Sequence, residues 1–272
     1  ACSRVAAAAP SFTAENKVFF TSVSVQSVVT IPGGFRMYLT SGPYHVVSAT
    51  CTDQINWGFE SGVRLSTTAG SLDVSSITAV SVVPSTDPAG GWRMYYVGID
   101  GTGLYRVLSA TSTNGLAWGK ETGTRLMHNS GQGFIGRLSG FSTSNTERRI
   151  YYIADQDGGN TPARYAVHTA TSGDGGLNFG VGTLTLAAAN AYAVSATTMT
   201  GGRTRLFYTS PLTGSTTASQ VLSATALDGL SFLTETGVRL STGASVSGFG
   251  GLVVVRSTES FRWRMYTDYI IG

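Results

Sequence analysis

Short runs in which side chains alternate between two faces recur along the whole chain. In Arg36-Met37-Tyr38-Leu39, the first and third residues point to one face of an extended strand and the other two to the opposite face. The motif returns as Arg93-Met94-Tyr95-Tyr96, Arg149-Ile150-Tyr151-Tyr152, Arg205-Leu206-Phe207-Tyr208 and Arg264-Met265-Tyr266-Thr267. Successive arginines are 57, 56, 56 and 59 residues apart. Five copies of one unit therefore fill the 272 residues.

Each unit contains four stretches of strand-forming residues. A β-rich run precedes the arginine motif, and in the first four copies another run follows it and ends in Ser-Ala-Thr or Thr-Ala-Thr. A polar turn then leads to an aromatic residue and a last short strand, as Asn114-Gly115-Leu116-Ala117-Trp118 leads to Thr122 through Leu126. No segment has helical periodicity. The pattern predicts one all-β domain over residues 1–272, a five-bladed β-propeller with four-stranded blades.

The charged residues that recur in the repeat are predicted to be structural. Glutamates stand before the fourth strand at Glu60, Glu121 and Glu235. We expect the repeat arginines to pair with these glutamates or to lie across a neighbouring aromatic ring. Aspartates occupy the turn at Asp53, Asp174 and Asp228, where a short acceptor side chain stabilises a tight turn.

The fifth copy lacks its outer strands, because only five residues follow its arginine motif. The stretch from Ser3 to Ala9 precedes the first inner strand at the spacing of an outer strand. We expect this N-terminal strand to join the last blade and close the ring, which would remove an exposed sheet edge. A disulfide between Cys2 and Cys51 would tie the closing strand to the first blade.

The blade motif resembles that of a known group of propellers. Arg93-Met94-Tyr95-Tyr96, a strand ending in Ser-Ala-Thr-Ser, and the turn from Asn114 to Trp118 are similar to those of the five-bladed propellers of arabinanases, β-xylosidases, fructosidases and mannoside phosphorylases. The turn also resembles a shortened Asp-box of sialidases, in which an Asp caps a tight turn above an aromatic ring. The hydrolases of this group imply carboxylates that converge on the propeller axis.

The acids that this resemblance implies do not appear at the matching positions. In those enzymes, they lie on or just before the innermost strands, and the corresponding residues here are Ser27, Ser81, Ser139 or Gly140, Ala196, and Val254 or Val255. Asp73 is the only acid shortly upstream of an inner strand and is the one candidate catalytic residue. Acids in hairpin loops (Asp100, Asp155 and Asp157) are set aside as solvated, and Asp268 is set aside because it lies near the end of the chain.

The composition limits which partners the protein could bind and indicates in which compartment it acts. Charged residues make up 12% of the chain and the formal net charge is +3, with no basic stripe that would suit nucleic acid. No apolar run approaches the ~18 residues that span a bilayer. A Lys-poor, Ser/Thr/Gly-rich chain suggests a secreted, periplasmic or cell-surface protein. The three histidines, His45, His128 and His168, lack metal-ligand spacing, so we expect neither a metal nor a cofactor.

A binding surface is expected at the axial mouth, in the loops before the inner strands. Arg137, with Phe134, Tyr192 and Phe249, could hold a polar ligand by hydrogen bonds and ring stacking. Because the catalytic acids are unmatched, we expect an exported non-catalytic module that binds or assembles, with a glycan or a protein surface as partner. Two alternatives stay open: a glycoside hydrolase in which Asp73 and the loop acids approach the axis, and a structural surface or filament protein.

Overall fold

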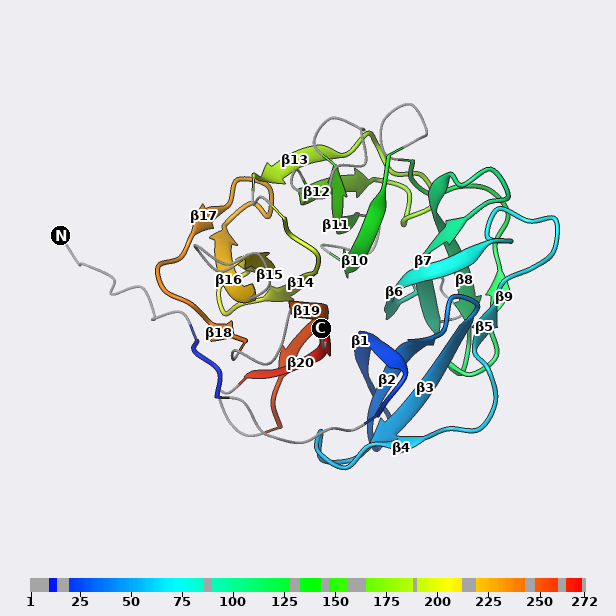
Figure 1. Ribbon diagram of the computed structural model, residues 1–272, viewed down its shortest axis with the longest axis horizontal. Coiled ribbons are helices and arrows are strands. Elements are labelled where there is room, and N and C mark those ends of the chain that lie inside the picture. The colour runs from blue at the N-terminus through cyan, green and yellow to red at the C-terminus, as the bar shows by residue number, and fades with distance from the viewer. Residues whose placement is uncertain are drawn as a thin grey trace.

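The chain folds as a β-propeller (Figure 1). The computed structural model describes residues 10–13, 20–85, 90–127, 133–142, 147–155, 165–187, 190–211, 219–242, 248–258 and 263–270. These residues contain strands and turns but no helix, as the sequence predicts. Accordingly, nothing in this part of the chain is a helix long and apolar enough to cross a membrane.

The strands are arranged from the axis outward in each blade. The inner strands are β1 (Val23–Ile31), β6 (Ser76–Pro84), β10 (Ile135–Ser142), β14 (Val194–Thr198) and β19 (Gly248–Arg256). The second strands are β2 (Gly34–Ser41), β7 (Trp92–Ile99), β11 (Arg148–Asp155), β15 (Thr204–Pro211) and β20 (Trp263–Ile270). Inner strands contact one another in the order β1, β6, β10, β14 and β19, and β19 also contacts β1. They therefore surround the axis (Figure 1).

The third and outer strands complete four of the sheets. The third strands are β3 (His45–Cys51), β8 (Tyr105–Ser112), β12 (Tyr165–Ser172) and β16 (Ser219–Ala226). The outer strands are β4 (Gly58–Phe59), β5 (Leu65–Ser66), β9 (Gly119–Lys120), β13 (Thr183–Leu186), β17 (Leu233–Thr234) and β18 (Leu240–Ser241). All neighbours within a sheet pair antiparallel.

The expected five four-stranded blades need correction. Within the described residues there are four blades of four or five strands, and β19 and β20 form a sheet of two strands only. The predicted closing strand, Ser3 to Ala9, lies outside the described residues, as does Cys2. Cys51 is buried. Because its predicted partner is not among the described residues, the disulfide stays a prediction.

The outer strands are also shorter than the sequence pattern predicts. In the first blade the outer strand is split into β4 and β5, with Gly62 between them at a φ of 86°. The Arg64 guanidinium donates to the Gly62 carbonyl at 2.9 Å. Gly237 and Arg239 repeat this arrangement in the fourth blade, with the same donor distance. The segment that the sequence predicts as one outer strand is therefore two short strands, and a turn stabilised by the arginine side chain lies between them.

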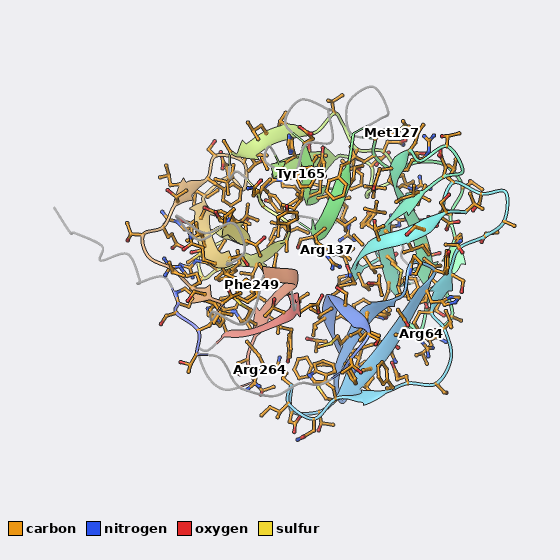
Figure 2. All side chains as sticks on the ribbon, viewed as in Figure 1. Arg64, Met127, Arg137, Tyr165, Phe249 and Arg264 are labelled. Carbon is orange, nitrogen blue, oxygen red and sulfur yellow. The ribbon has the colours of Figure 1, made fainter. Side chains whose placement is uncertain are left out.

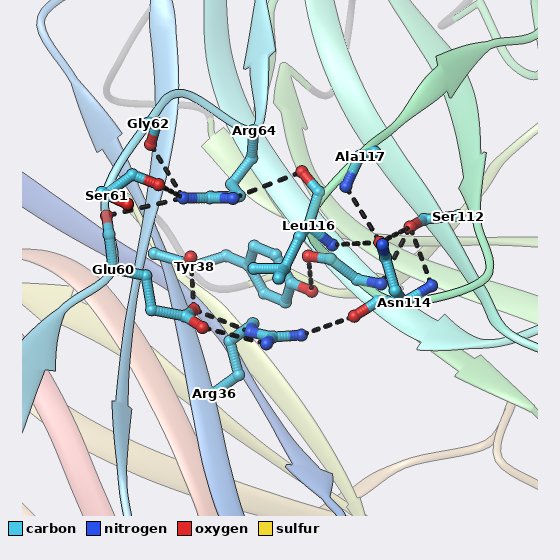
Figure 3. A network of polar contacts seen from close by, with 12 residues as sticks. Arg36, Tyr38, Glu60, Ser61, Gly62, Arg64, Ser112, Asn114, Leu116 and Ala117 are labelled. Carbon is cyan, nitrogen blue, oxygen red and sulfur yellow. Dashed lines mark hydrogen bonds and ion pairs between the residues drawn. The ribbon is translucent and has the colours of Figure 1, made fainter.

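The repeat arginine and tyrosine join neighbouring blades (Figure 3). Arg36 forms a bidentate pair with Glu60 at 2.8 and 3.0 Å, and its Nη1 donates to the Asn114 carbonyl of the next blade at 2.9 Å. Tyr38 donates its hydroxyl to the Gly115 carbonyl at 2.9 Å. The predicted Arg–Glu pairing is confirmed, and it recurs in Arg93–Glu121 at 3.1 Å and Arg205–Glu235 at 2.7 Å.

The turns that receive these bonds are built as the Asp-box resemblance implies. Asp53 accepts the backbone N–H groups of Ile55 and Asn56, both at 2.8 Å. These bonds, led by that of Asn56, lower the pKa of Asp53 to about 2. The aromatic residue after each turn then packs edge-on against the repeat tyrosine of the preceding blade, as Trp118 does on Tyr38 at 5.8 Å.

The core consists of separate clusters between blades. One cluster packs Tyr38 and Val29 of the first blade against Val80 and Met94 of the second, and four others fill the remaining gaps between inner strands. Blade stacking thus buries both faces of the second strands, and Tyr151 and Tyr152 are each 0% exposed. This explains why the arginine motif carries large side chains on both faces.

Replacing Tyr38 by phenylalanine should lower the free energy of unfolding by about 1–3 kcal/mol, because the Gly115 carbonyl loses its buried donor. Urea denaturation of the variant measures the change. Tyr44→Phe is the matched control, since Tyr44 is 51% exposed and should change stability little. Equal midpoints for Tyr38→Phe and the natural protein would contradict a stabilising role for this joint.

Candidate functional site

Bulges occur in four inner strands near the end at which those strands begin. The register shifts between Val25 and Ser27 in β1 and between Ile77 and Ala79 in β6. It shifts again between residues 135 and 138 in β10 and between residues 249 and 252 in β19. A bulge bends its strand and re-aims a side chain, and bulges are frequent beside active sites. This end of the propeller is therefore where the backbone departs most from a regular ladder.

Arg137 comes from the bulge of β10 and reaches across to two other blades. Its Nε donates to the Gly250 carbonyl of β19 at 3.0 Å, and its Nη2 donates to Ser24 Oγ of β1 at 2.5 Å. Figure 2 shows Arg137 near the centre of the ring of inner strands. The side chain predicted to bind a ligand therefore lies at the axial mouth, where the third, fifth and first blades approach one another.

Asp268 of β20 is the carboxyl group at this cluster. It accepts the Ser24 hydroxyl and, at 2.8 Å, the Val25 backbone N–H. Its Oδ2 lies 3.7 Å from Arg137 Nη2. A Cβ on Gly251 would lie 2.6 Å from Asp268 Oδ2, so the bulge needs glycine there for the carboxyl group to fit. We call Ser24, Arg137 and Asp268 the axial cluster.

Burial controls the electrostatics of the axial cluster. It raises the pKa of Asp268 above its ordinary value, against the hydrogen bonds from Ser24 and Val25 and the charge of Arg137. Burial also lowers the pKa of Arg137 from its ordinary value. The Nη1 atom of Arg137 is buried and has no hydrogen-bond partner. The cluster thus combines a carboxyl group that retains its proton to higher pH with a cation that is incompletely paired.

Four aromatic residues lie at the same end of blades two to four. Tyr105 and Tyr165 begin third strands, while Phe134 and Tyr192 precede inner strands. Phe134 stacks on Tyr165 with centroids 4.4 Å apart, and Tyr105 and Tyr192 contact this pair at 5.3 and 5.9 Å. Tyr192 is 47% exposed. These residues form an aromatic row that continues from the second blade to the fourth.

Phe249 has a different environment from the other three residues predicted to bind a ligand. It is 2% exposed and packs with Ala193 and Phe207 in the cluster between the last two sheets. Its ring therefore belongs to the core, and Arg137, Phe134 and Tyr192 are the predicted binding residues that stay near the mouth.

Asp73 is held in an ion pair away from the axial cluster. Its carboxylate contacts the Lys120 ammonium and accepts the Tyr96 hydroxyl at 3.1 Å and the Thr68 N–H at 3.1 Å. Burial opposes ionisation of Asp73, but the hydrogen bond from Lys120 and the bonds from Ser71 and Thr68 outweigh it and lower the pKa of Asp73. None of these contacts involves the axial cluster. The structure thus gives the residue predicted as catalytic a firmly paired, ionised state between the first two blades.

The loop acids are placed near the same end. Asp100 pairs with Arg106 at 2.9 Å and accepts the Thr102 hydroxyl at 2.7 Å. Asp155 is the last residue of β11, is 0% exposed and lies opposite Tyr165 in the ladder. Burial raises the pKa of Tyr165 to about 12, and the charge of Asp155 adds to this rise. Asp157 lies outside the described residues.

The described side chains gather no group of three or more His, Cys, Asp or Glu residues that could hold a metal ion. His45 shares a hydrogen bond with Ser66 at 3.1 Å, and His168 stacks on Tyr152. His128 lies outside the described residues. The donor groups at the axial cluster suit hydrogen bonding and proton transfer.

Sequence reasoning missed Asp268, although the repeat contains a signal for it. Four residues after the repeat arginine, the other copies have Thr40, Val97, Ile153 and Thr209. The fifth copy has a carboxyl group at this position, two residues after the buried Tyr266. A charge that replaces an apolar or hydroxyl residue in only one repeat indicates a role specific to that blade.

No family model matches the sequence, and no curated protein matches it. Solved structures do match the fold. A thermostable family-43 glycoside hydrolase superposes with a TM-score of 0.75 at 14% identity, over 94% of this chain and 87% of that one. An α-L-arabinofuranosidase from Lactobacillus brevis gives 0.68 at 11%, over 91% and 84%. An endo-arabinase from Bacteroides thetaiotaomicron gives 0.67 at 9%, over 91% and 88%.

The comparison confirms the predicted resemblance to the glycosidase propellers at the level of fold. It also corrects the expected function. The structural neighbours named above are glycoside hydrolases by title, which favours a hydrolase over the non-catalytic binding or assembly module predicted from the sequence. That prediction rested on the absence of acids at the matched inner-strand positions, and it overlooked an acid that reaches the mouth from a second strand.

Proposed function

We propose that this protein is a glycoside hydrolase that acts at the axial mouth of the propeller. The observation that carries the proposal is Asp268, a half-buried carboxyl group at the axial mouth that lies 3.7 Å from Arg137 and has a raised pKa. Glycoside hydrolysis needs such an acid, because it must retain its proton until it donates it to the leaving oxygen. The structural neighbours, a family-43 glycoside hydrolase and an α-L-arabinofuranosidase among them, support the same reaction class.

In this proposal Asp268 is the general acid. Its proton passes to the glycosidic oxygen as the bond to the anomeric carbon breaks, and water supplies the new oxygen at that carbon. Ser24 holds the carboxyl group in place, and Arg137 stabilises the carboxylate that remains after proton transfer. The aromatic row offers ring faces on which sugar rings stack.

The reaction needs a second carboxylate, and Asp155 is our candidate. It is a buried acid at the mouth end of β11, in the same blade as Arg137, and it neighbours Tyr165 of the aromatic row. Asp100, the other described loop acid, pairs with Arg106 and accepts the Thr102 hydroxyl. Asp155 would take a proton from the attacking water or attack the anomeric carbon itself.

Turnover of a substrate panel tests the function. The purified protein is incubated with nitrophenyl α-arabinofuranoside, β-xyloside and β-galactoside and with arabinan, xylan and pectin, and released sugar is measured between pH 4 and 8. We expect turnover of at least one substrate, with a rate that falls as rising pH removes the Asp268 proton. A folded protein that releases no sugar from any of them contradicts the proposal.

We also propose a fifth blade completed by the N-terminal segment. Phe12 packs edge-on against Phe207 at 5.7 Å, as Trp118 packs on Tyr38 in the first joint. The Phe12 N–H donates to the Arg239 carbonyl at 2.9 Å. Phe179, the aromatic residue after the third turn, donates in the same way to Arg125. Phe12 therefore occupies the place of a turn aromatic next to the fourth blade, which supports closure of the ring by this segment.

Phe12→Ala should lower the free energy of unfolding by about 3 kcal/mol, because the ring that covers Phe207 is lost at the joint between the fourth blade and β19–β20. Thermal and urea unfolding measure the loss. Leu233→Ala, at a side chain that is 78% exposed, is the control and should be near neutral. If Phe12→Ala is equally neutral, the N-terminal segment does not complete a blade.

A further inference from the structure

The guanidinium of Arg137 has fewer partners than a buried cation normally has. Its Nη2 and Nε are bonded to a hydroxyl and a carbonyl, both neutral, and Nη1 has no partner. The nearest carboxyl oxygen, of Asp268, is 3.7 Å away, which is beyond hydrogen-bonding distance. Arg36 and Arg93 at the blade joints differ from it, because each forms a bidentate pair with a glutamate.

The neighbouring acid does not supply a full counter-charge. The raised pKa of Asp268 means that its carboxyl group is neutral over a wider pH range than an ordinary aspartate. Of the other described acids near this end, Asp73 and Asp100 are paired with Lys120 and Arg106 respectively, and Asp155 lies opposite Tyr165 at the end of β11. A buried cation without a full counter-charge is costly, and an anion that joins it offsets that cost.

Arg137 lies where a ligand could supply the negative charge that its guanidinium lacks. About 20% of its side chain is exposed, so it is not sealed from solvent. It lies at the mouth between the first, third and fifth blades, in the same bulged strand that Phe134 of the aromatic row precedes. A planar guanidinium binds a carboxylate through two parallel hydrogen bonds. An anionic group on a stacked sugar ring that reaches this guanidinium would supply the acceptor that its Nη1 atom lacks.

We propose that Arg137 selects glycans that carry a carboxylate, so that the sugar bound at the axial mouth is a uronic acid residue. This inference deepens the proposed function, on which it rests, by naming the substrate class of the same site. The formal net charge of +3 favours approach of an acidic polymer. Discrimination between charged and neutral sugars then depends on the Arg137 guanidinium at the axis and not on a basic surface.

The test compares oligogalacturonides with their methyl esters, which have the same sugar chain without the charge. Binding is measured by calorimetry at 150 mM salt, and release of sugar is measured in parallel. We expect the acid form to bind about 10-fold or more tightly than the ester. Arg137→Met should abolish this preference. Arg137→Lys, which retains the charge but not the fork, should keep only part of it.

Arg256→Gln is the matched control for loss of one positive charge, because Arg256 is exposed and lies over Trp263 at the other end of β19. It should leave the preference unchanged. Equal binding of acid and ester, or the same loss in Arg256→Gln as in Arg137→Met, would overturn the inference. Turnover of neutral glycosides without this preference refutes the inference alone, whereas a preference for the acid form without any turnover refutes the hydrolase proposal alone.

Discussion

Asp268→Asn is expected to lower the turnover number by about 10²–10⁴-fold on any glycoside that the protein cleaves, because the amide cannot donate a proton to the leaving oxygen. The substitution preserves the shape of the side chain: the amide oxygen can still accept the Val25 N–H, and the amide nitrogen then donates to Ser24 Oγ in place of accepting from it. The pH profile provides the readout that a structural role would not affect. Burial raises the pKa of Asp268, so activity of the natural protein should fall as pH rises through that pKa.

The variant should lack this alkaline decline in its residual activity. Substrates with a good leaving group, such as dinitrophenyl glycosides, should lose less rate than those with a poor one, since they need less proton donation. Asp228→Asn, in an exposed turn, is the control and should retain full turnover. If Asp268→Asn keeps the natural rate and pH profile while it folds normally, Asp268 is not the acid.

Lys120→Met should lower the free energy of unfolding by about 3–5 kcal/mol at pH 7, because it leaves the Asp73 carboxylate buried without its cation. The Asp73 side chain is 1% exposed, and Tyr96 and Thr68 would then be its remaining donors besides Ser71. Urea unfolding followed by fluorescence measures the change. This is the largest effect on stability that we expect from a single substitution.

The pH dependence of that loss has a definite sign. In the natural protein the pKa of Asp73 is lowered, so its stabilising contribution is present above the ordinary pKa and disappears as pH falls through the lowered value. Without Lys120, burial raises the pKa of Asp73, so the deficit should shrink as the carboxylate takes up a proton on acidification. Asp73→Asn/Lys120→Met should recover much of the loss at pH 7. A double variant no more stable than Lys120→Met would contradict the pairing.

The repeat made most of the scaffold predictable from the sequence. The spacing of the arginine motifs indicated strands with both faces buried, and the structure confirms this for Tyr151 and Tyr152. The recurrence of Glu60 and Glu121 at one repeat position indicated their pairing with arginine, which is also confirmed. These features are accessible because each is repeated, so one physical explanation must fit several copies.

The site was predictable only in part. Arg137 was identified because it is a lone charge in a loop before an inner strand, and the structure places it at the axial mouth. Asp268 was set aside because it lies near the end of the chain and not upstream of an inner strand. Its contacts with Ser24 and Val25 join residues more than 240 positions apart, and no local pattern reveals such a pair.

By itself, the sequence determined the all-β propeller, the strand order in the complete blades and the recurring Arg–Glu pairs, because local alternation and repeat spacing dictate those features. Only the tertiary structure decided that Asp73 is an ion-pair partner and that Asp268 belongs to the axial cluster. The physical reason is that ionisation depends on burial and on the nearest charges, and a propeller brings those charges together from blades that are distant in sequence.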